Sequence, residues 1–175
     1  MTVAEVCVNT DPSIAPGLCR VRVWLLPADS PHHTEQRART ILRDVLGPLH
    51  IDGDAVADAE HVIAELAINA VQHAEPPCEL RIMFLGEVWP AWCEVADSSP
   101  ALDVVRRRLQ GAVVTADDAM IPELAESGRG LQVAAGLSNG RCAVYPTAIC
   151  QTGAIGKAIG FALPGTGAAA YSSPL

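Results

Sequence analysis

Three polar side chains stand four residues apart within an apolar stretch near the middle of the chain: Glu65, Asn69 and His73. At 3.6 residues per turn, this spacing places all three along one edge of a helix, while the apolar residues between them face elsewhere. A carboxylate can accept a proton, and an amide oxygen can bind a hard cation such as magnesium. The same pattern is also typical of a solvated polar edge on a half-buried helix. The choice between these interpretations rests on motifs further along the chain.

Two motifs follow downstream. Asp97-Ser98-Ser99-Pro100 comes directly after a strand-like run, and Ser127-Gly128-Arg129-Gly130-Leu131 opens a helix-like run. Glycine lets backbone amides approach an anion closely, and the positive end of the helix that begins there adds to the attraction. Arg129 could add a charge-assisted contact to a phosphate or to a neighbouring carboxylate. A lone Gly-x-Gly is typical of a tight turn, but in combination with the helix motif it indicates a phosphate site.

The elements that must position these residues follow from hydrophobic periodicity and turn signals. Alternation of apolar and polar residues is typical of strands, and apolar residues three or four apart are typical of helices. Gly47-Pro48 and Pro76-Pro77 end the two helical runs of the first half. In chain order we expect a strand over 18–27, helices over 34–46 and 54–74, strands over 79–85 and 91–97, a helix over 130–137, and strands over 141–145 and 154–163.

Residues 98–127 carry the weakest pattern, because prolines and a glycine interrupt a short helical patch over 104–109. Long connections in compact domains are often lids or binding loops, so this segment is either a cover for a ligand or a loop with a short packed helix. The order of the elements predicts an α/β two-layer sandwich, with a mixed, mainly antiparallel sheet and the helices on one face. We expect one domain over 18–163, an N-terminal extension over 1–17 and a flexible tail over 164–175.

Composition excludes several classes of function. The net charge of −8 argues against broad attraction to nucleic acid, and the one basic cluster, Arg106-Arg107-Arg108, is typical of a solvated or partner-facing patch. No run reaches the roughly 18 apolar residues of a membrane helix, and residues 1–12 lack the basic start and apolar centre of a secretory signal. The 6 cysteines include no C-x-x-C pair and no histidine at zinc-ligand spacing. We expect them to be small core residues in a reducing cytoplasm, with an oxidised pair left open.

The three motifs, in this order and on these elements, resemble the ATP-binding (Bergerat) fold of the GHKL superfamily. The closer similarity is to the anti-sigma-factor serine/threonine kinases and their actinobacterial relatives, and it spans roughly residues 21–163. Glu65-Leu66-x-x-Asn69-Ala70-x-x-His73 is similar to the asparagine-bearing helix motif of the superfamily. Gly128-Arg129-Gly130-Leu131 is similar to its second glycine box, and Asp97-Ser98-Ser99-Pro100 is a looser match to its first.

The resemblance implies a role for each matching residue. Asn69 would bind the magnesium ion that bridges the phosphates of ATP, and Glu65 would be the base that prepares water or a partner's serine hydroxyl for attack on the terminal phosphate. Asp97 would accept a hydrogen bond from the exocyclic amine of adenine. Gly128, Arg129, Gly130 and Leu131 would complete the nucleotide site. Phosphoryl transfer needs mostly positioning and charge neutralisation, which these residue types supply.

The chain departs from the pattern of the superfamily at two places. Ser98-Ser99-Pro100 stands where glycines usually follow the aspartate, which stiffens the backbone. Gly156-Lys157-Ala158 resembles the closing Gly-Lys-Thr but lacks the hydroxyl, so we expect Ala158 to lose a polar contact to the adenine region. Both departures favour weaker nucleotide binding.

Two functions follow from the resemblance. The first is an ATP- and magnesium-dependent protein kinase that phosphorylates an anti-anti-sigma partner and sequesters a sigma factor when that partner is absent. The second is a catalytically inactive module of the same fold, which regulates a protein partner with weak or no nucleotide binding. The resemblance also admits a homodimer.

Overall fold

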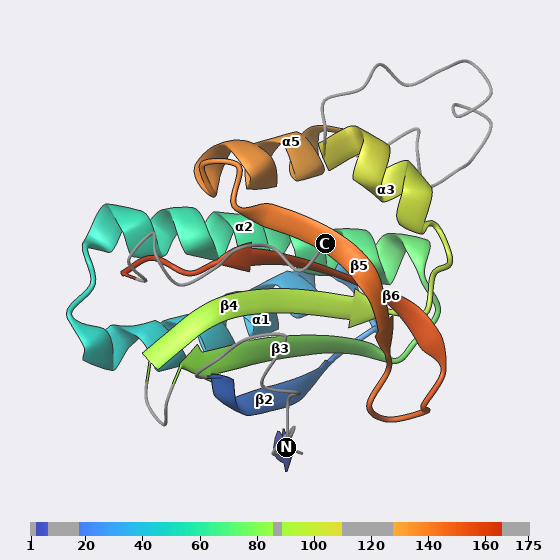
Figure 1. Cartoon of the computed structure of the whole chain (residues 1–175), viewed down its shortest axis with the longest axis horizontal. Coiled ribbons are helices and arrows are strands. Elements are labelled where there is room, and N and C mark those ends of the chain that lie inside the picture. The colour runs from blue at the N-terminus through green and yellow to red at the C-terminus, as the bar shows by residue number, and fades with distance from the viewer. Residues whose placement is uncertain (1–2, 7–17, 86–88, 110–127, 166–175) are drawn as a thin grey trace.

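The computed structural model describes residues 3–6, 18–85, 89–109 and 128–165, with side chains from residue 20 onward in the first half and from residue 130 onward in the last part (Figure 1). Within these residues the strands are β1 (Val3–Val6), β2 (Leu18–Leu26), β3 (Cys78–Leu85), β4 (Trp89–Asp97), β5 (Cys142–Ala148) and β6 (Ile155–Ala162). The helices are α1 (Pro31–Leu46), the 3-10 turn η1 (Gly47–Leu49), α2 (Gly53–His73), α3 (Leu102–Leu109) and α5 (Gly128–Leu137).

The six strands form one sheet in the order β1-β2-β3-β4-β6-β5, and each neighbouring pair is antiparallel. Helices α1 and α2 lie on one face of this sheet, α5 packs against α2, and α3 packs against α5 and β5 (Figure 1). The predicted α/β two-layer sandwich is confirmed.

Side-chain caps explain where the long helices begin. Ser30 accepts a hydrogen bond from the backbone N–H of His33 at 3.2 Å and Pro31 follows it, so α1 begins at Pro31 rather than at residue 34. The Asp52 carboxylate accepts hydrogen bonds from two N–H groups of the next turn, which begins α2 at Gly53. The two predicted helices are therefore confirmed, with small shifts at their ends.

Two elements lie in segments that carried little sequence signal. Strand β1 falls within the predicted extension over 1–17 and pairs with β2 from Val3↔Trp24 to Val6↔Val21. Four residues are too few to show a clear alternation, so periodicity gave no sign of this strand. Helix α3 extends the helical patch expected over 104–109. The predicted tail beyond residue 165 and the part of the predicted lid over 110–127 lie outside the described residues.

The main core fills the space between the sheet and its helices. Alternate residues of β3 and β4 point toward the helices, and α2 meets them with its apolar side. The buried members include Leu42, Val62, Ile63, Leu66, Leu80, Ile82, Cys93, Val95, Ile159 and Phe161. Since α2 packs directly on this core, the packing fixes the position of its polar edge relative to the sheet.

The cysteines with described side chains are Cys78, Cys93, Cys142 and Cys150, and none of these four is in a disulfide. Cys78 and Cys93 are buried in the core, which confirms the prediction for these two, whereas Cys150 is exposed. Among the described residues, no helix combines the length and the apolar character needed to span a bilayer.

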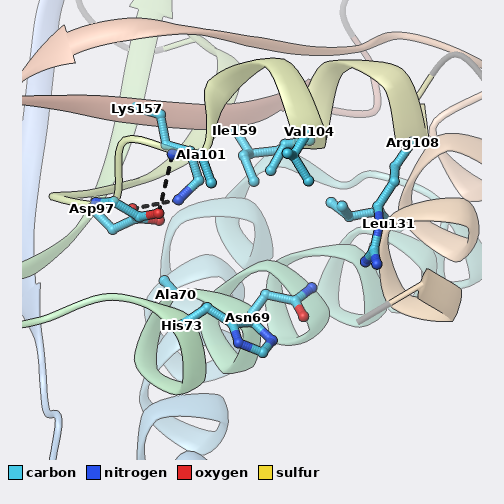
Figure 2. Close-up of a pocket in the computed structure, with 12 residues that line it drawn as sticks. Asn69, Ala70, His73, Asp97, Ala101, Val104, Arg108, Leu131, Lys157 and Ile159 are labelled. Atoms are coloured by element: carbon cyan, nitrogen blue, oxygen red, sulfur yellow. Dashed lines mark hydrogen bonds and ion pairs between the residues drawn. The ribbon is translucent and has the colours of Figure 1, made fainter. Parts of the chain in front are cut away.

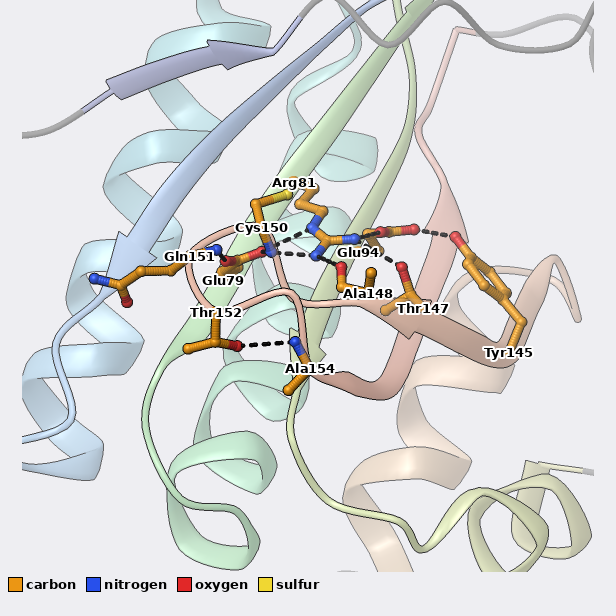
Figure 3. Close-up of polar contacts among 10 residues, drawn as sticks. All are labelled: Glu79, Arg81, Glu94, Tyr145, Thr147, Ala148, Cys150, Gln151, Thr152 and Ala154. Carbon is orange, nitrogen blue, oxygen red and sulfur yellow. Dashed lines mark hydrogen bonds and ion pairs between the residues drawn. The ribbon is translucent and has the colours of Figure 1, made fainter.

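A buried polar network lies on the sheet face opposite the helices (Figure 3). The Arg81 guanidinium donates to Glu79 Oε2 at 2.6 Å and to Glu94 Oε1 at 3.3 Å, and all three side chains are buried. Arg81 also donates to the Thr147 hydroxyl and to the carbonyl oxygen of Ala148. One guanidinium therefore joins β3 and β4 to the end of β5.

The connection between β5 and β6 covers the same network. The N–H groups of Cys150 and Gln151 donate to the two oxygens of Glu79, and the Tyr145 hydroxyl donates to Glu94 (Figure 3). Burial alone would raise the pKa of Glu79, but the hydrogen bonds from Arg81 and from these N–H groups outweigh it and lower that pKa. Burial raises the pKa of Glu94, against the hydrogen bond from Tyr145 and the charge of Arg81.

Replacing Arg81 with methionine should destabilise the fold by about 3–5 kcal/mol, because it leaves buried carboxylates without their cation. Urea unfolding at neutral pH measures the loss. Arg106→Ala is the control, since Arg106 forms only an exposed pair with Asp103 at 3.4 Å and its loss should change stability by less than about 0.5 kcal/mol.

The Arg81→Met deficit should also depend on pH. Glu79 has a lowered pKa in the wild type, so its stabilising contribution is present above its unfolded pKa and is lost as the pH falls through its folded pKa. The difference between the two proteins should be full above about pH 5 and should narrow as the pH falls from about 5 to about 3. A deficit that stays constant over this range would mean that lost packing, and not charge, is the cause.

Candidate functional site

The polar edge of α2 lies where the helix spacing predicted. Glu65, Asn69 and His73 are half-buried, whereas Leu66 and Ala70 between them are buried in the core. The three side chains therefore belong neither to the fully solvated face of the helix nor to the packed face. They border the space beneath α3 and α5.

A small cavity adjoins this edge (Figure 2). Its walls come from α2, from β4 and the turn after it, from α3, from α5 and from β6. The lining residues are Asn69, Ala70, His73, Asp97, Ser99, Ala101, Val104, Val105, Arg108, Leu131, Lys157 and Ile159. Of the predicted site residues, the cavity thus brings together Asn69, Asp97 and Leu131. Glu65 lies one helical turn before Asn69 and outside the lining.

Asn69 has a buried polar atom, Nδ2, without a hydrogen-bond partner among the described residues. Buried polar groups in native proteins are nearly always satisfied, so a lone one at a cavity wall points to a ligand. The side-chain amide can present either a donor or an acceptor toward such a ligand. An unpartnered amide N–H suits an anionic ligand such as a phosphate oxygen, whereas the magnesium role implied for Asn69 requires its Oδ1 atom.

The first turn of α5 lies against Glu65 and Asn69. A Cβ atom placed on Gly130 would stand 2.5 Å from Glu65 Oε2 and 3.2 Å from Asn69 Nδ2, so only glycine permits this approach without a shift. Helix α5 begins at Gly128, which brings the positive end of its dipole to the same region. The side chain of Arg129, a predicted phosphate contact, lies outside the described residues.

Asp97 is buried at the end of β4, with 2% of its surface exposed. Its Oδ1 atom accepts a hydrogen bond from the Lys157 ammonium at 2.6 Å and another from the backbone N–H of Ser99 at 2.9 Å. Burial raises the pKa of Asp97, and the charge of Lys157 opposes that rise. The carboxylate that the resemblance assigns to adenine is therefore held in a buried ion pair (Figure 2).

The structure corrects the interpretation of Ala158. In the β4–β6 register Asp97 stands opposite Lys157, so Lys157 faces the cavity. Neighbouring residues of a strand point to opposite faces, and Ala158 accordingly packs with Ala96 and Ile149 on the other side of the sheet. A hydroxyl at position 158 would not reach the cavity. The residue of this motif that lines the cavity is Lys157.

Ser98 and Ser99 stand where the superfamily usually has glycines, and their hydroxyls form hydrogen bonds that hold the turn. The Ser98 hydroxyl donates to the carbonyl oxygen of Glu75 at 2.8 Å, which ties the end of β4 to the segment after α2. Ser99 Oγ accepts from the N–H of Ala101 at 3.3 Å, next to the start of α3. The expected stiffening of this turn is thus explained by specific hydrogen bonds.

Helix α3 fills much of the site. Val104, Val105 and Arg108 line the cavity, which measures about 30 Å³, whereas small-molecule sites usually begin near roughly 300 Å³. Arg108 is buried, with 6% of its surface exposed, while Arg106 and Arg107 are exposed. The prediction of a solvated arginine patch is therefore wrong for Arg108. In the sequence, Arg108 follows Val104 by four residues and Val105 by three, and this helical spacing indicates that the three side chains share one face.

The contact at Gly130 gives a prediction with an internal control. Gly130→Ala should destabilise the protein by about 1–2 kcal/mol, because the new methyl group displaces the Glu65 carboxylate. Gly136→Ala in the same helix meets nothing within 4 Å and should stabilise by about 0.5–1 kcal/mol through helix propensity. Thermal and urea unfolding would measure both. In a Glu65→Ala background the Gly130→Ala loss should shrink, and an undiminished loss would contradict the proposed clash.

Comparison with known proteins adds one finding. Residues 27–142 match the family model described as a histidine kinase-like ATPase domain, and this span is well over half of the chain. It contains α2, the end of β4 with Asp97, α3 and α5, which form most of the cavity walls. A comparison with curated proteins gave no match. The chain therefore belongs to the histidine kinase-like ATPase domain family, within the GHKL superfamily of ATP-binding proteins.

Proposed function

We propose that this protein is an ATP- and magnesium-dependent serine/threonine kinase of the anti-sigma-factor type, which phosphorylates an anti-anti-sigma protein and sequesters a sigma factor. The observation that carries the proposal is the juxtaposition of three features around one cavity: the unsatisfied amide of Asn69, the buried carboxylate of Asp97 and the close approach of Gly130 to α2. These features come from distant parts of the sequence, and each suits a different part of a nucleotide.

The cavity has two chemically distinct ends. Asp97 and Lys157 lie at one end and suit the polar edge of a base, while Asn69 and Arg108 lie toward the other, near the first turn of α5 (Figure 2). A triphosphate carries several negative charges, so the N-terminus of α5 favours it. When bound, magnesium would neutralise part of that charge, and Asn69 is the described side chain suited to hold it. No group of three or more His, Cys, Asp or Glu residues among the described ones offers an alternative metal site.

We assign Glu65 the role of a base rather than that of a metal ligand. It lies one turn from Asn69 on the same edge of α2, and its carboxylate reaches the first turn of α5 at Gly130. A carboxylate beside a bound phosphate can take the proton from an attacking hydroxyl, which is the one proton transfer that the reaction requires. In the proposed reaction the acceptor is a serine hydroxyl of the anti-anti-sigma protein.

Nucleotide entry requires α3 to shift. The cavity of about 30 Å³ is far smaller than a nucleoside triphosphate, and α3 contributes Val104, Val105 and Arg108 to its lining. This helix is short, and two of its three consecutive arginines face solvent. We infer that the described arrangement is a closed form and that α3, as part of the predicted lid over 98–127, moves outward when nucleotide binds.

Nucleotide binding can be tested without knowing the partner. Calorimetric titration with ATP and magnesium should show binding, and Asn69→Ala should weaken it at least about tenfold because the amide ligand is lost. Removing magnesium with a chelator should weaken binding to the wild type but have much less effect on the variant. Gln72→Ala, an exposed change on the same helix, is the control. No heat at millimolar ATP would instead favour the regulatory module without nucleotide.

Phosphoryl transfer tests the catalytic part of the proposal. With labelled ATP and a co-purified anti-anti-sigma candidate, Glu65→Gln should reduce transfer by about 10²–10⁴-fold, because glutamine cannot accept the proton. ATP affinity should stay within about threefold of wild type, since the proposed base contributes little to ground-state binding. Equal transfer by both proteins would exclude Glu65 as the base.

A further inference from the structure

A second cavity lies at the other end of the contact between α2 and α5. The first turn of α5 meets α2 at Glu65 and Asn69, whereas this cavity is lined by the end of α5 and the first half of α2, together with the end of β6. It measures about 130 Å³ and shares no lining residue with the cavity beside Asn69. The proposed kinase reaction makes no use of it.

Helix α2 contributes small and apolar residues to this second cavity. Ala55, Asp58, Ala59 and Val62 are spaced so that all four share one side of the helix, and the two alanines leave room above it. Ala59 and Val62 are buried and, with the buried Phe161, form an apolar floor. A dry apolar cavity of about 150 Å³ admits benzene, so this floor has room for an aliphatic side chain.

Two opposite charges stand at the mouth of the second cavity. Asp58 of α2 and Arg141, which precedes β5, are both exposed, and both line the cavity. No ion pair joins them, and among the described residues neither side chain has a hydrogen-bond partner. A carboxylate and a guanidinium that are held apart over one apolar space can each bind one charge of a zwitterion.

The turn between α5 and β5 fixes the backbone of Arg141. Asn139 and Gly140 have positive φ angles of 53° and 73°, which turn the chain sharply after the helix. The N–H of Arg141 donates to the carbonyl oxygen of Ser138, and its own carbonyl oxygen accepts from the N–H of Ala162, both at 3.0 Å. The carboxyl end of α5 lines the same cavity, and the negative end of the helix dipole favours a cation there.

We propose that this second cavity binds a free aliphatic α-amino acid of about the size of leucine. Asp58 and the end of α5 bind the α-ammonium group, Arg141 binds the α-carboxylate, and the side chain packs on the apolar floor. The volume lies below the roughly 300 Å³ at which sites for larger ligands begin, so the ligand is small and keeps its charged groups at the mouth. The site is separate from the proposed nucleotide site and does not depend on it.

Calorimetric titration of the full chain with L-leucine, without nucleotide, tests the site directly. We expect saturable binding with a dissociation constant of about 0.1–1 mM, which a ligand of about nine non-hydrogen atoms can reach. Asp58→Asn and Arg141→Gln should each weaken binding at least about tenfold, because each removes one charge from the mouth. Asp44→Asn and Arg106→Gln remove exposed charges elsewhere and should leave the affinity unchanged.

Leucine analogues and a matched pair of alanine substitutions locate the ligand. Leucinamide lacks the carboxylate and N-acetyl-leucine lacks the ammonium group, so each should bind at least about tenfold more weakly than leucine. The loss caused by Arg141→Gln should be absent with leucinamide. Ala55→Leu fills the cavity and should abolish binding, whereas Ala57→Leu, at an exposed position of the same helix, should not change it.

Several results would overturn the proposal. Absence of saturable binding up to about 10 mM L-leucine, which is tenfold above the weakest affinity expected, excludes the site. Equal affinity of the wild type and folded Ala55→Leu places the ligand elsewhere. Equal affinity for leucine and N-acetyl-leucine excludes recognition of the ammonium group. Circular dichroism and thermal unfolding report folding, and if Ala55→Leu does not fold, the charge variants and the analogues still decide.

Discussion

Helix α2 is packed on two sides, and this constraint determines where its polar residues can lie. Its apolar side rests on the sheet through residues such as Val62 and Leu66, and α5 approaches it so closely at Gly130 that a Cβ atom there would meet the Glu65 carboxylate. Polar side chains of α2 that bind a ligand can therefore lie only on the strip between these two contacts. Glu65 and Asn69 lie on that strip, so the packing of the fold itself delivers a carboxylate and an amide to the site.

Charge is buried on both faces of the same central strands, and each face balances it differently. On the cavity side, Asp97 forms an ion pair with Lys157 and accepts from the N–H of Ser99, and the pair lines the cavity. On the opposite face, Arg81 is surrounded by two glutamates and backbone groups. Buried charges are costly unless they are paired and hydrogen-bonded. The network enclosed by glutamates and backbone groups suits a structural role, whereas the pair at the cavity wall suits a ligand.

Local signals predicted the scaffold well and the cavity only in part. Caps such as Ser30 and Asp52 act within one turn, so the helices could be predicted from nearby residues. The pairing of Asp97 with Lys157 depends instead on the register of β4 against β6, which joins positions 60 residues apart. The burial of Arg108 likewise depends on how α3 docks. The register of one strand against another leaves no mark in local periodicity, and this is why the pairing of Lys157 with Asp97 emerged only from the structure.

Ser99 connects the Asp97 carboxylate to the start of α3. Its backbone N–H holds the Asp97 carboxylate, and its hydroxyl accepts from Ala101 beside the start of α3. An outward shift of α3 therefore pulls on the same residue that orients the carboxylate at the base end. If the closed form predominates, the apparent affinity for nucleotide is reduced by the fraction of molecules that are open. On the proposed opening, Ser99 couples the movement of α3 to the orientation of the Asp97 carboxylate.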